Sequence, residues 1–181
     1  MEHAPALWHS NTRLLCEAHL SHVAGELGLD ALPEGLCESG PRTWLPFPDS
    51  LPALLLLHAL GCRCGLITNW DYTARDVVAK LGLERLLSPI VVSAEAGCEK
   101  PERRVFELAL DAAGVGAHEA VYVGDNYWAD VLGAQDAGLS AVLVDRHPQW
   151  SGRRWPCETI ADLWGVVRVV TRRTEVAAQI S

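Results

Sequence analysis

The sequence has no long apolar run and no surplus of positive charge, and each absence excludes a class of partner. No stretch reaches the ~18 consecutive apolar residues of a membrane-spanning helix, because His58 interrupts the apolar run that begins at Leu54. The formal net charge is −8. Neutralising phosphates requires clustered Lys and Arg, so we expect neither nucleic acid nor an anionic membrane as a partner.

The six cysteines are irregularly spaced and form no C-x-x-C pair, which argues against a disulfide framework or a zinc site. Cys62 and Cys64 read as packing residues within a strand. The N-terminus has no basic region followed by an apolar core, so we expect no secretory signal. Reduced thiols and a cytoplasmic location follow as expectations.

The 181 residues suffice for one domain with a sizeable core. From residue 62 onward, strand-like and helix-like patterns alternate with short connections, which predicts an α/β fold with a mostly parallel sheet. The expected strands are 62–68, 89–93, 121–123 and 141–144. The expected helices are 9–28, 50–61, 71–81, 101–113, one ending near 137, and 158–167, with a frayed tail from 172.

Two acids lie at the end of a predicted buried strand, in the stretch V-Y-V-G-D-N-Y-W-A-D from Val121 to Asp130. Asp125 follows the strand directly, and Asp130 falls in the first turn of a predicted helix. Ligands bind beyond the carboxyl ends of strands in open parallel sheets, so the position suits metal or phosphate chemistry. Taken alone, the pattern is equally that of a strand, a glycine turn and an acid that complements a helix dipole.

Polar side chains follow two other predicted strands. Thr68 and Asn69 offer a hydroxyl and an amide beside a helix N-terminus, an arrangement that suits phosphate, although such residues also cap helices routinely. Lys100 precedes a proline that keeps it extended, and it is one of two lysines in the chain. A hydroxyl, a lysine and paired acids on successive strand ends predict a phosphoryl-transfer site, and Mg²⁺ requires only one or two such carboxylates plus phosphate oxygen.

These motifs resemble those of the haloacid dehalogenase superfamily of hydrolases. The matching segments are I-T-N at 67–69, E-K-P at 99–101 and V-G-D-N-Y-W-A-D at 123–130. The resemblance implies a Rossmann-like parallel sheet with helices on both faces. It also implies a core at 46–170, preceded by the remnant of a helical cap at 1–45 and followed by a tail at 171–181.

The resemblance also implies roles for individual side chains. Thr68 would hydrogen-bond the transferring phosphoryl group, together with Asn69 beside it. Lys100 would act in catalysis by neutralising charge on the nucleophile and the phosphate. Asp125 and Asp130 would hold Mg²⁺.

The first motif of this superfamily, a strand ending in D-x-D, has no counterpart before Leu66. Its first aspartate is the covalent nucleophile, and without such a carboxylate the remaining frame can bind phosphate but cannot attack it. The missing strand is central in the family, between the strands that end at Thr68 and Val123. Its loss leaves two facing edges, which pair directly, are filled by another segment, or leave the isolated chain poorly stable.

The resulting hypothesis is a Mg²⁺-dependent phosphatase that acts on a small phosphate ester through a phosphoaspartate, with little or no turnover by this polypeptide alone. Either the chain is a truncated form of a full hydrolase, or it is a non-catalytic phosphate-binding or protein-interaction module, a pseudophosphatase. Dehalogenases of the same class work without metal, and the paired acids favour the phosphatase branch instead. A response-regulator receiver is disfavoured because its acids should precede the lysine. The oligomeric state stays open.

Overall fold

The computed structural model describes residues 44–146 and 154–180, with side chains up to 173. The helix expected at 9–28 lies outside the described residues, as does the expected cap remnant at 1–45 except for its last two residues. Within the described part, no helix is long and apolar enough to cross a membrane.

Five short strands form two parallel sheets. The first sheet pairs β1 (Leu66–Thr68) with β2 (Ile90–Val92). The second sheet has the order β3-β4-β5, where β3 is Val121–Gly124, β4 is Ser140–Val144 and β5 is Glu158–Ile160. Every pairing in both sheets is parallel, as the alternating pattern predicts.

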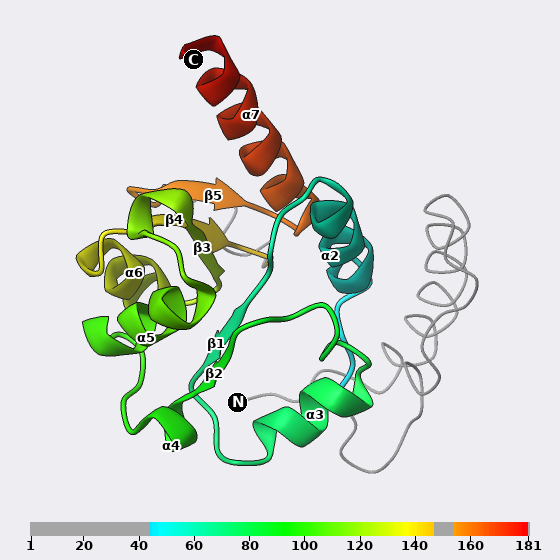
Figure 1. Cartoon of the computed structure of the whole chain (residues 1–181), viewed down its shortest axis with the longest axis vertical. Coiled ribbons are helices and arrows are strands. Elements are labelled where there is room, and N and C mark those ends of the chain that lie inside the picture. The colour runs from blue at the N-terminus through cyan, green and yellow to red at the C-terminus, as the bar shows by residue number, and fades with distance from the viewer. Residues whose placement is uncertain (1–43, 147–153, 181) are drawn as a thin grey trace.

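Helices connect and cover these strands (Figure 1). They begin and end close to the turn and glycine signals of the sequence, as at Gly114, which has φ +66° at the C-terminus of α5. In chain order they are α2 (Ser50–Ala59), α3 (Ala74–Lys80), α4 (Ser93–Ala96), α5 (Arg103–Ala113), a 3₁₀ turn (Ala117–Glu119), a π-helical turn (Tyr127–Leu132), α6 (Gly133–Asp136) and α7 (Trp164–Ile180). Parallel strands with helical crossovers on their faces confirm the predicted α/β, Rossmann-like fold.

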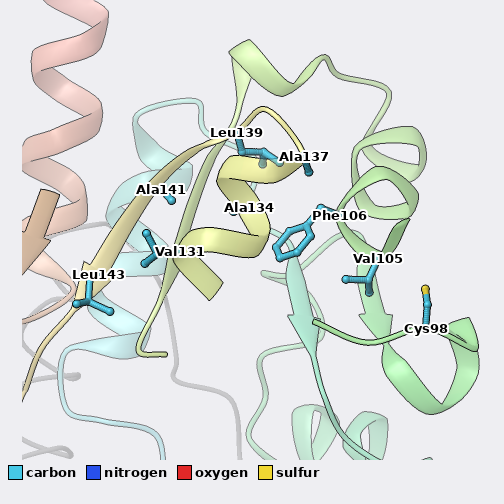
Figure 2. Close-up of a cluster of buried hydrophobic side chains, with 9 residues drawn as sticks. All are labelled: Cys98, Val105, Phe106, Val131, Ala134, Ala137, Leu139, Ala141 and Leu143. Carbon is cyan, nitrogen blue, oxygen red and sulfur yellow. The ribbon is translucent and has the colours of Figure 1, made fainter. Parts of the chain in front are cut away.

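The main apolar core joins α5 to the second sheet (Figure 2), and residues of the first sheet pack against it. Val105 and Phe106 of α5 are fully buried and lie in one cluster with Val131, which follows β3 in the chain. Ile67 of β1 and Val91 of β2 pack against the same cluster from the other sheet. One helix therefore fixes the two sheets relative to each other through apolar contacts.

The strands β1 and β3 each have an edge that pairs with no strand of the described residues. All seven residues of these two strands are only half-buried, whereas four of the five residues of β4 are buried. β4 is covered by a strand on both edges, so the difference follows from pairing. Direct pairing of the two facing edges, one of the three outcomes expected from the missing strand, does not occur.

The C-terminal part differs from the prediction. Glu158–Ile160 does not begin a helix but pairs with β4 as β5. The helix begins at Trp164 and runs to Ile180, so residues expected to form a frayed tail continue it. Val166 and Val169, three residues apart, are buried, and α7 packs against α2, which stabilises its first turns.

One further expectation is corrected near the described N-terminal end. The strand expected from Cys62 begins only at Leu66, so Cys62 and Cys64 lie before it; burial, with Cys62 nearby, raises the pKa of the Cys64 thiol to about 11. Asp49 stands at the N-cap of α2 but does not cap it. Its buried carboxylate accepts hydrogen bonds from Arg146 at 2.8 Å and from the backbone N–H of Leu163 at 2.6 Å.

Candidate active site

Lys100 and Asp130 form a buried ion pair at the carboxyl end of β3. The Lys100 Nζ lies 2.7 Å from Asp130 Oδ1, and the two side chains are 14% and 3% exposed. Asp130 Oδ2 accepts a hydrogen bond from the backbone N–H of Asn126 at 2.8 Å. The carboxylate thus has a charged partner and a backbone partner, which a buried acid requires.

Tyr122 on β3 completes this polar cluster. Its hydroxyl accepts a hydrogen bond from Lys100 Nζ and donates one to Asp130 Oδ1, each at 3.2 Å. Its ring packs edge-on against Phe106, with 5.1 Å between ring centroids. Burial, followed by the negative charge of Asp130 and, less strongly, of Asp125, raises the pKa of the Tyr122 phenol far above its ordinary value.

Asn69 joins the end of β1 to the same cluster. Its side-chain Nδ2 donates to the carbonyl of Lys100, and its Oδ1 accepts from the N–H of Lys100, both at 2.8 Å. The structure therefore brings together Asn69, Lys100 and Asp130, three of the five predicted site residues, in one continuous hydrogen-bonded chain. This series of hydrogen bonds connects the first sheet to the second.

The loop after β3 is shaped to place Asp130 under the strand. The Asn126 side chain accepts from the backbone N–H groups of Trp128 and Ala129, and so caps the π-helical turn that carries Asp130. Gly124 leaves the space that Asp130 occupies, since a Cβ at Gly124 would lie 2.3 Å from Asp130 Cγ. A π-helical turn adds one residue per turn and recurs at functional sites.

Thr68 and Asp125 are the other two predicted site residues. Thr68 directly precedes Asn69, and Asp125 directly precedes Asn126, whose backbone N–H binds Asp130. Thr68 is the last residue of β1 and is half-buried. Asp125 follows β3 and is exposed. Among the described residues neither side chain makes a hydrogen bond, so a hydroxyl and a carboxylate are available to a ligand beside Lys100.

The donor set fits Mg²⁺ as a partial site. No group of three or more His, Cys, Asp or Glu gathers around an ion site in the described ranges. The carboxylate of Asp125 is free to bind an ion with both oxygens. The carboxylate of Asp130 has roughly four acceptor sites, and about three of them accept hydrogen bonds from Lys100, Tyr122 and Asn126. Mg²⁺ prefers oxygen ligands, keeps several waters and also takes phosphate oxygens, so this supply is compatible with the ion when phosphate is present.

Sequence reasoning missed three residues of the cluster, namely Tyr122, Gly124 as the space for Asp130, and Asn126 as a cap. Tyr122 reads as one more strand residue, because its hydroxyl matters only through partners at positions 100 and 130. Asn126 could have been found, since an Asn directly before a helical pattern is a common N-cap.

The raised pKa of Tyr122 predicts an alkaline loss of stability that a Tyr122→Phe variant lacks. An unfolded tyrosine titrates at roughly pH 10, whereas the folded chain keeps this proton to higher pH. The stability that depends on the protonated Tyr122 phenol is therefore fully present below the pKa of the unfolded state. This stability is lost as the pH rises above that pKa, because the unfolded state then binds fewer protons than the folded state. Between pH 8 and pH 11 we expect the wild-type chain to lose about 1.4 kcal/mol more free energy of unfolding than the variant in urea titrations. Equal losses would contradict a protected phenol.

The chain is similar to curated proteins over part of its length. It is 35% identical over 120 residues to haloacid dehalogenase-like hydrolase domain-containing protein 3 of Danio rerio. The matched region covers 65% of this chain and 50% of that protein. It is 38% identical over 101 residues to glyceraldehyde 3-phosphate phosphatase of Methanothermobacter thermautotrophicus, covering 55% of this chain and 45% of that protein. The chain thus spans about half the length of these relatives.

Solved structures support the fold. A HAD phosphatase from Thermococcus onnurineus superimposes with a TM-score of 0.67 at 24% identity, over 91% of this chain and 88% of the other. The family model for haloacid dehalogenase-like hydrolases matches residues 8–138, which is most of the sequence. The chain belongs to the haloacid dehalogenase-like hydrolase family.

Proposed function

We propose that this chain carries the phosphate- and magnesium-binding half of a phosphatase site for a small phosphorylated substrate, and that alone it releases little or no phosphate. The observation that carries the proposal is the hydrogen-bonded chain from Asn69 through Lys100 to Asp130 at the carboxyl ends of β1 and β3. The phosphatase name of the Methanothermobacter relative supports the reaction class. We keep a cytoplasmic location and a cap at residues 1–45 as parts of the same proposal.

Four of the side chains have a direct role in binding the phosphate group or its metal ion, namely Lys100, Thr68, Asp125 and Asp130. Lys100 has three N–H donors, of which Asp130 and Tyr122 take two, so one donor and the positive charge serve the phosphate. The Thr68 hydroxyl supplies a second hydrogen bond to a phosphate oxygen. Asp125, with the remaining acceptor of Asp130, would hold Mg²⁺, which when bound neutralises charge on the phosphate oxygens.

Hydrolysis requires a nucleophile that the described residues do not supply. In the family the nucleophile is an aspartate at the end of a central strand, whose phosphoaspartate is the covalent intermediate. The unpaired edges of β1 and β3 fit the absence of that strand. We therefore expect Lys100 and Thr68 to bind and orient phosphate without bond cleavage.

Binding and turnover, measured separately, test this proposal. In isothermal titration calorimetry we expect inorganic phosphate to bind in the presence of Mg²⁺, and we expect Lys100→Ala to abolish that binding. The matched control is Lys80→Ala, since Lys80 is the other lysine of the chain and is exposed on α3. With an aryl phosphate, release at the rate of a buffer blank is expected. Robust Mg²⁺-dependent release that Asp125→Ala abolishes would contradict the absence of a nucleophile.

A second candidate function is a non-catalytic protein-interaction module. The unpaired edges of β1 and β3 favour it, because half-buried strands with unpaired N–H and C=O groups accept an added strand. Amide hydrogen exchange separates the two cases. A partner that binds these edges slows exchange in β1 and β3 together, whereas phosphate alone leaves the edge amides of both strands in fast exchange.

A further inference from the structure

The side-chain amide of Asn69 is bound to the backbone of a residue 31 positions away. It donates to the carbonyl of Lys100 and accepts from the N–H of Lys100, so both ends of one amide hold one residue. A bidentate contact of this kind fixes orientation as well as distance. The sequence assigned Asn69 to phosphate, but in the structure its amide holds the loop that carries Lys100.

Asn69 is itself held in place from the side of the first sheet. The next residue, Trp70, donates its backbone N–H to Ser93 Oγ at 3.0 Å, and Ser93 Oγ donates to the carbonyl of Trp70 at 3.1 Å. Ser93 directly follows β2, which pairs with β1. The amide of Asn69 therefore extends from a loop fixed to two strands.

The other end of Lys100 is held from the second sheet. Its ammonium contacts Asp130 and Tyr122, and Tyr122 belongs to β3. Since β1 and β3 are not paired with each other, Lys100 spans two separate sheets. The place of its ammonium depends on where its backbone is fixed, and Asn69 fixes it.

We propose that Asn69 is a positioning residue for Lys100, which acts by clamping the Lys100 backbone and does not contact the phosphate. This inference concerns the site of the proposed function. It rests on that function only for the measurement of phosphate binding. Without the clamp, the 99–101 loop moves relative to Asp130, and the Lys100 ammonium samples several positions.

The two lysines of the chain permit a direct test. In the full chain labelled with ¹³C at lysine Cε, we expect two separate NMR signals, one from exposed Lys80 and one from Lys100, whose side chain is 14% exposed. In Asn69→Ala the Lys100 signal should broaden or move toward that of Lys80. Acylation by acetic anhydride, followed by peptide mass spectrometry, should show Lys100 of Asn69→Ala reacting about fivefold faster than Lys100 of the wild type, the net effect expected of losing the two Asn69 hydrogen bonds. Lys80 is the internal standard.

A variant in the same loop serves as the control. Asp71 accepts hydrogen bonds from the Thr73 N–H and hydroxyl, and neither bond involves Lys100. Asp71→Ala should leave the Lys100 signal and acylation rate unchanged. Asn69→Asp keeps the size of the side chain but replaces the donor to the Lys100 carbonyl with an oxygen, which the carbonyl repels. It can therefore replace Asn69→Ala in the test if that variant folds poorly. An unchanged Lys100 in both Asn69 variants would overturn the proposal.

Phosphate binding provides the second readout. We expect Asn69→Ala to weaken the binding of inorganic phosphate with Mg²⁺ about fivefold, again the net effect of losing the two Asn69 hydrogen bonds, and Asp71→Ala to leave it unchanged. If the wild-type chain binds no phosphate, the proposed function fails while the lysine signals still test the clamp. If phosphate binds equally to wild type and Asn69→Ala while Lys100 is displaced, the clamp does not serve the site, and the proposal is overturned.

Discussion

Replacing Gly124 by alanine is expected to lower the free energy of unfolding by about 3 kcal/mol and to abolish phosphate binding. The added Cβ would lie 2.3 Å from Cγ and 2.5 Å from Oδ2 of Asp130, so Asp130 must move. The Asp130 side chain is only 3% exposed, and its movement breaks its contacts with Lys100, Tyr122 and the Asn126 N–H. Urea titrations at neutral pH measure the stability, and calorimetry with inorganic phosphate and Mg²⁺ measures the binding.

Gly61 provides the matched control for this glycine. It has φ +80°, and a Cβ there would meet no atom within 4 Å. Gly61→Ala should therefore cost only the roughly 1 kcal/mol of the left-handed conformation and leave phosphate binding intact. Equal losses in both variants would mean that the contact with Asp130 is not the cause.

The order of elements could be predicted from the sequence because each element carries a local signal. Runs such as Val121 to Val123 are β-branched or aromatic, and Gly114 ends its helix in the left-handed conformation that glycine adopts readily. β5 carries only a short signal of this kind, because Thr159 and Ile160 are β-branched but Glu158 is not. Glu158–Ile160 is three residues long, and its strand conformation depends on pairing with β4, a contact distant in sequence.

In the candidate site, too, local motifs could be recognised in the sequence, whereas contacts between distant residues could not. Lys100 and Asp130 could be named from their motifs, since acids and lysine at strand ends indicate phosphoryl transfer. That they bind each other at 2.7 Å, and that Asn69 holds a backbone 31 residues away, depends on how loops from two sheets meet. Residue type indicates which side chains can take part in phosphate chemistry, whereas the contacts between these side chains are visible only in the fold.

Truncation of Asp130 to alanine is expected to lower the free energy of unfolding by about 3 kcal/mol, because it leaves a buried ammonium without its counter-charge. Lys100 is only 14% exposed, and the Tyr122 hydroxyl and Asn126 N–H would lose an acceptor at the same time. Lys100→Met removes the charge but keeps the apolar stem. The double variant should therefore be more stable than the sum of the single effects by about 2 kcal/mol, measured as a double-mutant cycle in urea.

The exposed pair Arg103–Glu107 is a control that shows whether the loss of stability depends on burial of the ion pair or only on the N···O distance. Its N···O distance is also 2.7 Å, but its side chains are 60% and 45% exposed. Water screens such a pair and solvates whichever partner remains, so Glu107→Ala should change the stability far less than Asp130→Ala. Similar losses at the two sites, or a cycle without coupling between Lys100 and Asp130, would mean that the buried pair does not hold the two sheets together at this end.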